Sequence, residues 1–408
     1  MMSAVLLALF ANSAVSAQPT KLPSPPKIDA SCAILEDADT GQVLYAKNPG
    51  VPRPPASCTK IMTAILLLEH TQPDDIIVAS KNAADTGGSS MYLQPGERIT
   101  AHDLLYGILM LSANDGCVAA AEHIAGSVAN FVKMMNEKAA AIGCTNTHFS
   151  NCNGLSNVDH YTTAADLALM ARYAFQIPEF DEVIQTKYYR IHRSINQQNV
   201  FLRNIDHFLW DYPGAIGVKT GFTDAAGWCF VGSATRKGWR LVSVLLNCPN
   251  IYHETAELDN WAYNNFKRVL AAKAGAVVGQ ATVIGGKRRM VSLRLAQPVY
   301  VVVPKNSNER ISLQVEPDTL KAPVAIGEPA GRVIVQLNGK PVVNEPLTAS
   351  AAVAKSGSYV AASVSPYALL VLILFGFGIL RYGSSITKIV GRRRNRLETR
   401  LREFDRFR

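Results

Sequence analysis

The stretch Pro55-Ala56-Ser57-Cys58-Thr59-Lys60-Ile61-Met62-Thr63 is the most informative part of this sequence of 408 residues. It leaves a Pro-rich loop and opens an apolar run that predicts a helix from Ser57 to His70. Ser57 and Lys60 are three residues apart, nearly one helical turn, so their side chains share a face. A serine hydroxyl needs a neighbouring base, and a lysine is such a base only if burial or another cation lowers its pKa. Taken alone, a helix-capping serine followed by an ordinary lysine is the better interpretation.

Two further segments change that interpretation. Ser112-Ala113-Asn114 lies in a break between helices predicted at 102–111 and 116–125, where polar side chains could relay a proton and hold an amide. Lys219-Thr220-Gly221 ends an apolar strand predicted at 216–220 and offers a cation, a hydroxyl and an open backbone to a substrate carboxylate. Taken alone, the first segment is interpreted as a loop and a helix cap, and the second as the turn that ends a strand. Together, in this order and context, the three segments indicate a serine acyl-transfer site.

The sequence resembles the low-molecular-mass penicillin-binding proteins, the serine-type D-alanyl-D-alanine carboxypeptidases of peptidase family S11. Penicillin-binding proteins and class A β-lactamases share the three-segment signature. The resemblance spans about residues 29–347 and also includes Gly88-Ser89-Ser90-Met91, Asn153-Gly154-Leu155, His160-Tyr161-Thr162-Thr163-Ala164, Tyr212-Pro213-Gly214 and Gly217-Val218-Lys219-Thr220-Gly221-Phe222-Thr223. It implies an α+β fold, with a β-lactamase/transpeptidase-like catalytic domain, then a small all-β domain and a C-terminal transmembrane helix.

The resemblance implies three catalytic residues: Ser57, Lys60 and Ser112. Ser57 would attack the carbonyl between two D-alanines, and Lys60 would accept its proton. Ser112 would help to pass that proton to the leaving amine, and water would then cleave the acyl-serine. The implied reaction removes the terminal D-Ala from peptidoglycan stem pentapeptides, with β-lactams as covalent inhibitors and without cofactor or metal.

The resemblance implies five substrate-binding residues, which are Asn114, Lys219, Thr220, Gly221 and Phe222. Asn114 would bind the substrate amide, while Lys219 and Thr220 would hold the terminal carboxylate and tune Lys60. The oxyanion would lie between the backbone N–H groups of Ser57 and Phe222, and one such donor is typically worth about 10²–10³ in rate.

The sequence departs from the family pattern in two places. Asn151-Cys152-Asn153-Gly154-Leu155 lacks the Pro-His or Pro-Asn that is common there, and Asn204-Ile205-Asp206 stands where Asn-x-Asn is common. Either departure could alter substrate fit. Cys58, beside the nucleophile, is either a reactive thiol or, in the favoured interpretation, a small packed side chain.

The other Cys and His residues give weaker signals. Seven Cys leave at least one thiol unpaired, and Cys144/Cys152 and Cys229/Cys248 are conceivable bridges. Eight His residues show no metal spacing, and His102, His123, His148 and His160 are expected to cap or pack.

The hydrophobic pattern predicts two folded domains. The first is a catalytic domain at 29–272. It is expected to contain a hairpin at 30–48, helices at 57–70, 102–111, 116–125, 131–142 and 163–174, strands at 216–220, 227–235 and 240–247, and a helix at about 254–271. Residues 273–348 alternate between apolar and polar, and Leu337-Asn338-Gly339-Lys340 is a hairpin signal, so a β domain is expected there.

The two ends predict export and anchoring. Residues 1–17 resemble a signal peptide without its usual basic start, and 18–28 form a Pro-rich linker. After a linker at 349–359, the uncharged stretch 360–380 is long enough to span a bilayer. The net charge is +9, but the tail at 381–408 carries ten Lys/Arg and three Asp/Glu, and so accounts for most of it. We therefore expect a single-pass cell-membrane protein with an extracytoplasmic body, whose tail contacts anionic lipid rather than nucleic acid.

Three alternatives stay open from the sequence. A β-lactamase would usually carry a Glu that positions water, and no family-like Glu segment stands between the second and third motifs. A non-enzymatic penicillin-binding scaffold is disfavoured by the intact Ser57, Lys60 and Lys219. A transpeptidase or endopeptidase uses the same motifs, and the products formed from a stem pentapeptide would separate it from a carboxypeptidase.

Overall fold

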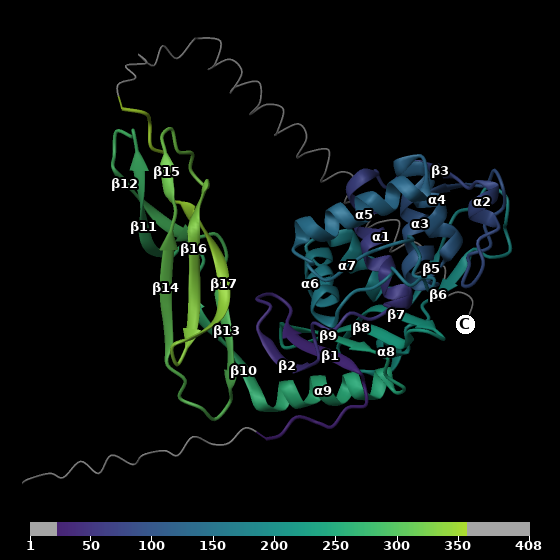
Figure 1. The fold of residues 1–408 in the computed structure, drawn as a ribbon, viewed down its shortest axis with the longest axis horizontal. Helices are drawn as coiled ribbons and strands as arrows, with labels where there is room; N and C mark the ends of the chain where they lie inside the picture. Colours follow the sequence, from purple (N-terminus) through teal and green to yellow (C-terminus); the bar gives the residue numbers. More distant parts are fainter. Residues whose placement is uncertain (1–22, 357–408) are drawn as a thin grey trace, which may run out of the picture.

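The computed structural model describes residues 23–356 and places them in two domains joined by one helix (Figure 1). The predicted signal peptide, transmembrane helix and basic tail lie outside the described residues. Within residues 23–356, no helix is both long and apolar enough to cross a membrane.

The catalytic domain is built on an antiparallel sheet in the order β2-β1-β9-β8-β7. Its strands are β1 (Cys32–Asp37), β2 (Val43–Lys47), β7 (Ala215–Thr223), β8 (Gly227–Arg236) and β9 (Trp239–Leu246). The central strands are apolar on both faces because each face is covered by helices. β7 is an edge strand of this sheet, so one side of its backbone is not paired within it.

Helices from the middle of the chain cover one face of the sheet and extend beside it. They are α1 (Lys60–His70), α3 (Ala101–Met110), α4 (Asn114–Ala125), α5 (Val128–Ile142), α6 (Ala164–Ala174) and α7 (Pro178–Gln185). Their buried side chains form one large core with the near face of the sheet. α8 (His207–Asp211) and α9 (Ile251–Asn265) pack on the other face and close a second core.

Several short elements complete the helical side of this domain. They are the 3-10 turn η1 (Ala56–Thr59), the helix α2 (Lys81–Ala84), and the strand pairs β3 (Ile76–Val78) with β4 (Arg98–Thr100) and β5 (Tyr188–Arg190) with β6 (Phe201–Arg203). Three or four residues each are too few for a clear periodic signal, and the sequence did not predict these short helices and strands. α7 was also missed, although Pro178 at its first turn is a helix-start signal.

The predicted helix at 254–271 is wrong at its C-terminal end. α9 stops at Asn265, and the next seven residues are the strand β10 (Phe266–Ala272), which pairs with β13 (Val299–Pro304). Pairing with a partner some thirty residues along the chain decides this conformation, and no local periodicity reports it.

The β domain is confirmed as an all-β unit. A six-stranded sheet has the order β14-β16-β17-β12-β11-β15. The strands are β11 (Val277–Ile284), β12 (Met290–Leu295), β14 (Ile311–Pro317), β15 (Thr319–Lys321), β16 (Pro329–Leu337) and β17 (Lys340–Ala349). The predicted hairpin is β16–β17, where Asn338 and Gly339 both have positive φ, as a two-residue type I′ turn requires.

The two domains contact each other beside α9. The Gln42 side chain donates to the Val302 carbonyl and accepts from the Val302 N–H, both at 2.7 Å and both buried. The Arg268 guanidinium forms an ion pair with Asp39 and lies 3.9 Å from the Tyr300 ring centroid. The far end of the β domain, by contrast, projects away from the catalytic domain (Figure 1).

Candidate active site

Ser57 lies on a strained turn that presents it at the start of α1. The turn is η1, and Ala56 within it has a φ of +48°, in the left-handed region that residues with a Cβ seldom adopt. Neighbouring contacts hold this conformation. The Ala56 carbonyl accepts from the Thr59 hydroxyl at 2.8 Å, and Thr59 is in turn 2.8 Å from the His160 ring. Buried His160 therefore supports the nucleophile turn, in line with the packing role expected for it.

Lys60 is fully buried, and its amine lies 2.9 Å from the Ser57 hydroxyl. The same nitrogen donates to Asn114 Oδ1 at 2.7 Å and to the Asn153 carbonyl at 2.6 Å. Burial lowers the pKa of Lys60 and favours its neutral form. A neutral amine has two N–H donors and one lone pair, so donation to the two oxygens leaves the lone pair facing the hydroxyl of Ser57.

Ser112 and Asn114 flank the bend between α3 and α4, where Ser112 has a φ of +62°. Both are almost completely buried. Asn114 contacts Lys60 through Oδ1, while its Nδ2 donates to the Gly87 carbonyl at 2.7 Å. The Ser112 hydroxyl has no hydrogen-bond partner among residues 23–356, so the structure brings Ser112 to the site without joining it to Lys60.

The third motif lies on the edge strand β7, directly against the nucleophile turn. Gly221 packs so closely that a Cβ there would lie 2.7 Å from the backbone nitrogen of Ser57. The Lys219 side chain is buried and donates to the Thr220 carbonyl at 2.8 Å. Burial, then the nearby charge of Lys60, lowers the pKa of Lys219 to about 7. Phe222 is half-exposed, and its ring packs on Trp228 at 4.7 Å between centroids.

Asn153 and Gly154 lie in the segment whose departure from the family pattern could alter substrate fit, and both contact the residues around Ser57. The Asn153 carbonyl accepts from Lys60, and Gly154 lies so close to Ala56 that a Cβ would be 1.9 Å from its carbonyl oxygen. Gly154 also has a φ of +89°. Only the folded chain shows these contacts, because nearly one hundred residues separate the two segments.

A loop at residues 87–93 holds Asn114 from the outside. The Ser89 carbonyl accepts from the Asn114 N–H at 2.7 Å. Buried Asp115 fixes the loop by accepting from the N–H groups of Met91 at 3.1 Å and Leu93 at 2.9 Å. The motif predicted a polar bend here, but the structural role of Asp115 gave no separate signal.

A buried ion pair closes this loop from a distant segment. Arg193 donates to Glu97 through Nε at 2.7 Å and through Nη2 at 2.8 Å, and both side chains are fully buried. The same guanidinium donates to the carbonyls of Met91 at 2.6 Å and Tyr92 at 2.9 Å. Two charges would be costly to bury unless they were paired in this way. Arg193 was not among the residues predicted from the sequence.

The cysteines near the site are packed thiols. All seven are free and buried, so neither conceivable bridge is present. Cys58 Sγ lies 3.6 Å from the Lys219 carbonyl, and burial raises the pKa of the thiol, which opposes a reactive thiolate. Among residues 23–356, no group of His, Cys, Asp and Glu side chains has a metal-binding arrangement.

Comparisons with known proteins define the class. Residues 19–250 match the D-alanyl-D-alanine carboxypeptidase family of S11 peptidases, and residues 266–355 match the C-terminal domain of penicillin-binding protein 5. The chain therefore belongs to the D-alanyl-D-alanine carboxypeptidases, the low-molecular-mass penicillin-binding proteins. It is a serine hydrolase of that family, as its sequence predicted.

Individual relatives match this chain over most of their length. The D-alanyl-D-alanine carboxypeptidase DacF of Bacillus subtilis is 32% identical, covering 86% of this chain and 93% of the relative. DacC of Escherichia coli is 33% identical, covering 86% and 91%. The crystal structure of penicillin-binding protein 5 from Haemophilus influenzae superposes with a TM-score of 0.68 at 29% identity, covering 81% of this chain and 99% of that one.

Proposed function

We propose that Ser57 is the nucleophile with which this D-alanyl-D-alanine carboxypeptidase removes the terminal D-alanine of peptidoglycan stem peptides. The observation that carries the assignment is the position of Ser57 between the amine of Lys60 and the backbone of β7. The Ser57 hydroxyl transfers its proton to neutral Lys60 as its oxygen attacks the carbonyl carbon of the scissile amide.

The backbone N–H groups of Ser57 and Phe222 then stabilise the oxyanion. The close approach of Gly221 to the Ser57 nitrogen supports this pairing, because it brings the end of β7 next to the nucleophile turn. Any side chain at Gly221 would separate the two segments.

The terminal carboxylate of the substrate binds to Lys219 and Thr220. The carboxylate would favour the protonated form of Lys219, whose pKa is lowered to about 7 in the free protein. A cation there in turn keeps Lys60 neutral, so substrate binding prepares the base.

The leaving amine of D-alanine takes its proton from Lys60 through Ser112, which lies buried in the adjacent bend. Asn114 binds the amide of the substrate backbone, although both ends of its carboxamide already have partners in the free protein. The Oδ1 keeps a second lone pair and the Nδ2 a second N–H, so the substrate amide can bind without displacing Lys60 or Gly87. Water finally hydrolyses the acyl-serine, and a β-lactam would remain bound at the same ester.

The test is release of free D-alanine from a stem pentapeptide by the purified full chain, with Ser57→Ala as the paired variant. We expect a loss of at least about 10³-fold in the variant, because it removes the hydroxyl that lies 2.9 Å from the amine of Lys60. A Ser57→Ala variant that still released D-alanine, or that was still covalently labelled by a β-lactam, would show that another residue is the nucleophile. Products joined to a second peptide would instead indicate transpeptidation.

We also propose that the chain is exported by residues 1–17 and anchored by residues 360–380, with the described domains on the extracytoplasmic side. The uncharged stretch at 360–380 is long enough to span a bilayer. The ten basic residues that follow it support a cytoplasmic tail and so an extracytoplasmic body. Protease added to intact spheroplasts should digest both domains. Complete protection of the domains would mean that the orientation is inverted.

A further inference from the structure

The described chain ends at the far tip of the β domain, in contact with the β11–β12 turn. The Ser356 N–H donates to the Gly285 carbonyl at 2.7 Å, and the Lys287 N–H donates to the Ala354 carbonyl at 2.8 Å. β15 ends at the same place, where Lys321 lies opposite Ile284. We call residues 282–290, 319–325 and 352–356 together the distal tip, which lies at the end of the β domain opposite α9 (Figure 1).

The distal tip carries an excess of positive charge. It carries five positive side chains, which are Lys287, Arg288, Arg289, Lys321 and Lys355. One carboxylate lies against it, that of Glu328, which accepts from the Ala325 N–H at 2.7 Å. All five are exposed, and none forms an ion pair within residues 23–356. Three of them are consecutive on one turn, so the positive charge is concentrated there.

Exposed apolar side chains accompany these charges. Ile284 is 55% exposed and Met290 is 45% exposed, one at each base of the basic turn. Aliphatic groups beside lysine and arginine suit a surface whose outer layer is anionic and whose interior is apolar. A soluble anionic polymer would use the charges but would gain nothing from the apolar pair.

The position of the predicted membrane span determines which surface the distal tip meets. Only three residues separate Ser356 from the uncharged stretch at 360–380. Four Cα-to-Cα steps cover at most about 14 Å, even when fully extended. Long basic side chains on the distal tip can bridge much of that distance, and phosphate headgroups then lie within about one Debye length of their charges.

We propose that the distal tip docks on the anionic headgroups of the outer face of the membrane and so fixes the β domain on the bilayer. The proposal rests on the membrane span inferred above. Five basic groups near an anionic surface, each worth about 1 kcal/mol, would hold the β domain in a defined orientation, whereas a tether alone would let it rotate.

The experiment is hydrogen–deuterium exchange of the full chain in nanodiscs of phosphatidylcholine, with or without phosphatidylglycerol. We expect the turn at 285–289 to exchange roughly tenfold more slowly when the anionic lipid is present, and the protection to disappear at high salt. The variant Lys287→Glu/Arg288→Glu/Arg289→Glu should lose the protection and still release D-alanine from soluble pentapeptide at the normal rate.

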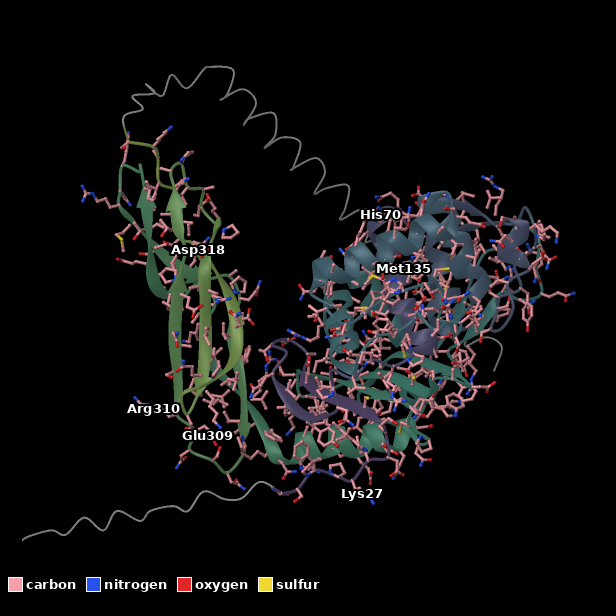
Figure 2. All side chains as sticks on the ribbon, in the orientation of Figure 1. Lys27, His70, Met135, Glu309, Arg310 and Asp318 are labelled. Atoms are coloured by element: carbon pink, nitrogen blue, oxygen red, sulfur yellow. The ribbon has the colours of Figure 1, made fainter. Side chains whose placement is uncertain are left out.

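A matched control changes the same amount of charge at the opposite end of the β domain. Lys305→Glu/Arg310→Glu/Lys340→Glu alters three exposed basic residues there, and Figure 2 labels Arg310 at that end. The control should keep the protection at 285–289. Equal loss in both variants, or equal exchange in both lipids, would overturn the proposal.

Two other outcomes separate this proposal from those on which it rests. If the full chain does not associate with nanodiscs, both the proposed membrane span and the proposed docking of the distal tip are wrong. Loss of D-alanine release with protection intact would count against the proposed chemistry alone. A soluble anionic wall polymer could instead protect the turn at 285–289 in neutral nanodiscs while phosphatidylglycerol does not. That result would make the polymer, and not the lipid surface, the partner of the distal tip.

Discussion

The catalytic domain and the β domain differ in what they bury. The catalytic domain encloses charged side chains such as Lys60, Glu97, Asp115, Arg193 and Lys219. Among residues 266–356, every side chain classed as buried is apolar, and the core consists mainly of valine and leucine. Burying a charge costs free energy unless it is paired, so this cost falls on the domain that contains the reaction site.

After the loss expected for Ser57→Ala, the largest effect is expected at the buried cation of the third motif. Lys219→Met should lower the rate of D-alanine release by at least about 10²-fold, because the substrate carboxylate loses its cation. It should also stabilise the fold by about 1–2 kcal/mol at pH 7, since a buried cation with one hydrogen bond is replaced by an apolar side chain. Activity and thermal unfolding would be measured on one preparation.

The pH dependence of stability sharpens this prediction. The pKa of Lys219 is about 7 in the folded protein and, for a free side chain, 10.5. Between these values the unfolded chain binds more protons, so wild-type stability should rise with pH from about 7 toward 10. The variant should lose the part of that slope that Lys219 contributes and keep the part due to buried Lys60, whereas exposed Lys305→Met should keep the whole slope. A Lys219→Met protein less stable than wild type at pH 7 would contradict the cost assigned to this cation.

The next effect concerns close approach at the nucleophile turn. Gly154→Ala should lower activity by about 10²-fold, because its Cβ would meet the Ala56 carbonyl oxygen and displace Ser57. Gly238→Ala is the matched control, since Gly238 has a similar φ of +76° but no atom within 4 Å of its Cβ position. Steady-state kinetics of both variants would isolate the contact from backbone strain. Equal losses would mean that strain alone is responsible.

A smaller effect is expected from the ion pair behind the loop at 87–93. Arg193→Lys keeps the charge but loses the paired hydrogen bonds to Glu97, and we expect about a tenfold slower acylation by a β-lactam. Arg193 acts through Asn114, so the change should fall on the acylation rate rather than on substrate KM. Arg332→Lys, in the exposed pair with Glu316, should leave the rate unchanged. A loss confined to thermal stability would make Arg193 purely structural.

The smallest effect on activity should come from the β domain. Leu293 is fully buried in its core, and Leu293→Ala should cost about 2–5 kcal/mol of stability through cavity formation. Release of D-alanine from soluble pentapeptide at 25 °C should stay within about twofold of wild type. A large fall in kcat while the β domain is still folded would show that the two domains are coupled in catalysis.

Much of the fold was predictable because its signals are local. The continuous apolar runs in β8 and β9, the helical periodicity in α5 and the Asn338-Gly339 turn all depend on near neighbours. The end of α9 was not predictable, because residues 266–272 become a strand only by pairing with β13. Short elements such as β3 and β5 likewise exist because a partner strand is present.

The three motifs, their order and the types of domain follow from residue identity and short-range pattern alone. Folding was needed to bring the Lys60 amine within hydrogen-bond distance of Ser57, Asn114 and the Asn153 carbonyl at once. It alone also placed Arg193 behind the loop at 87–93 and brought together on the distal tip five cations without an ion pair. The physical reason is that pKa values and close contacts depend on burial and on partners distant in the chain, which no local pattern encodes.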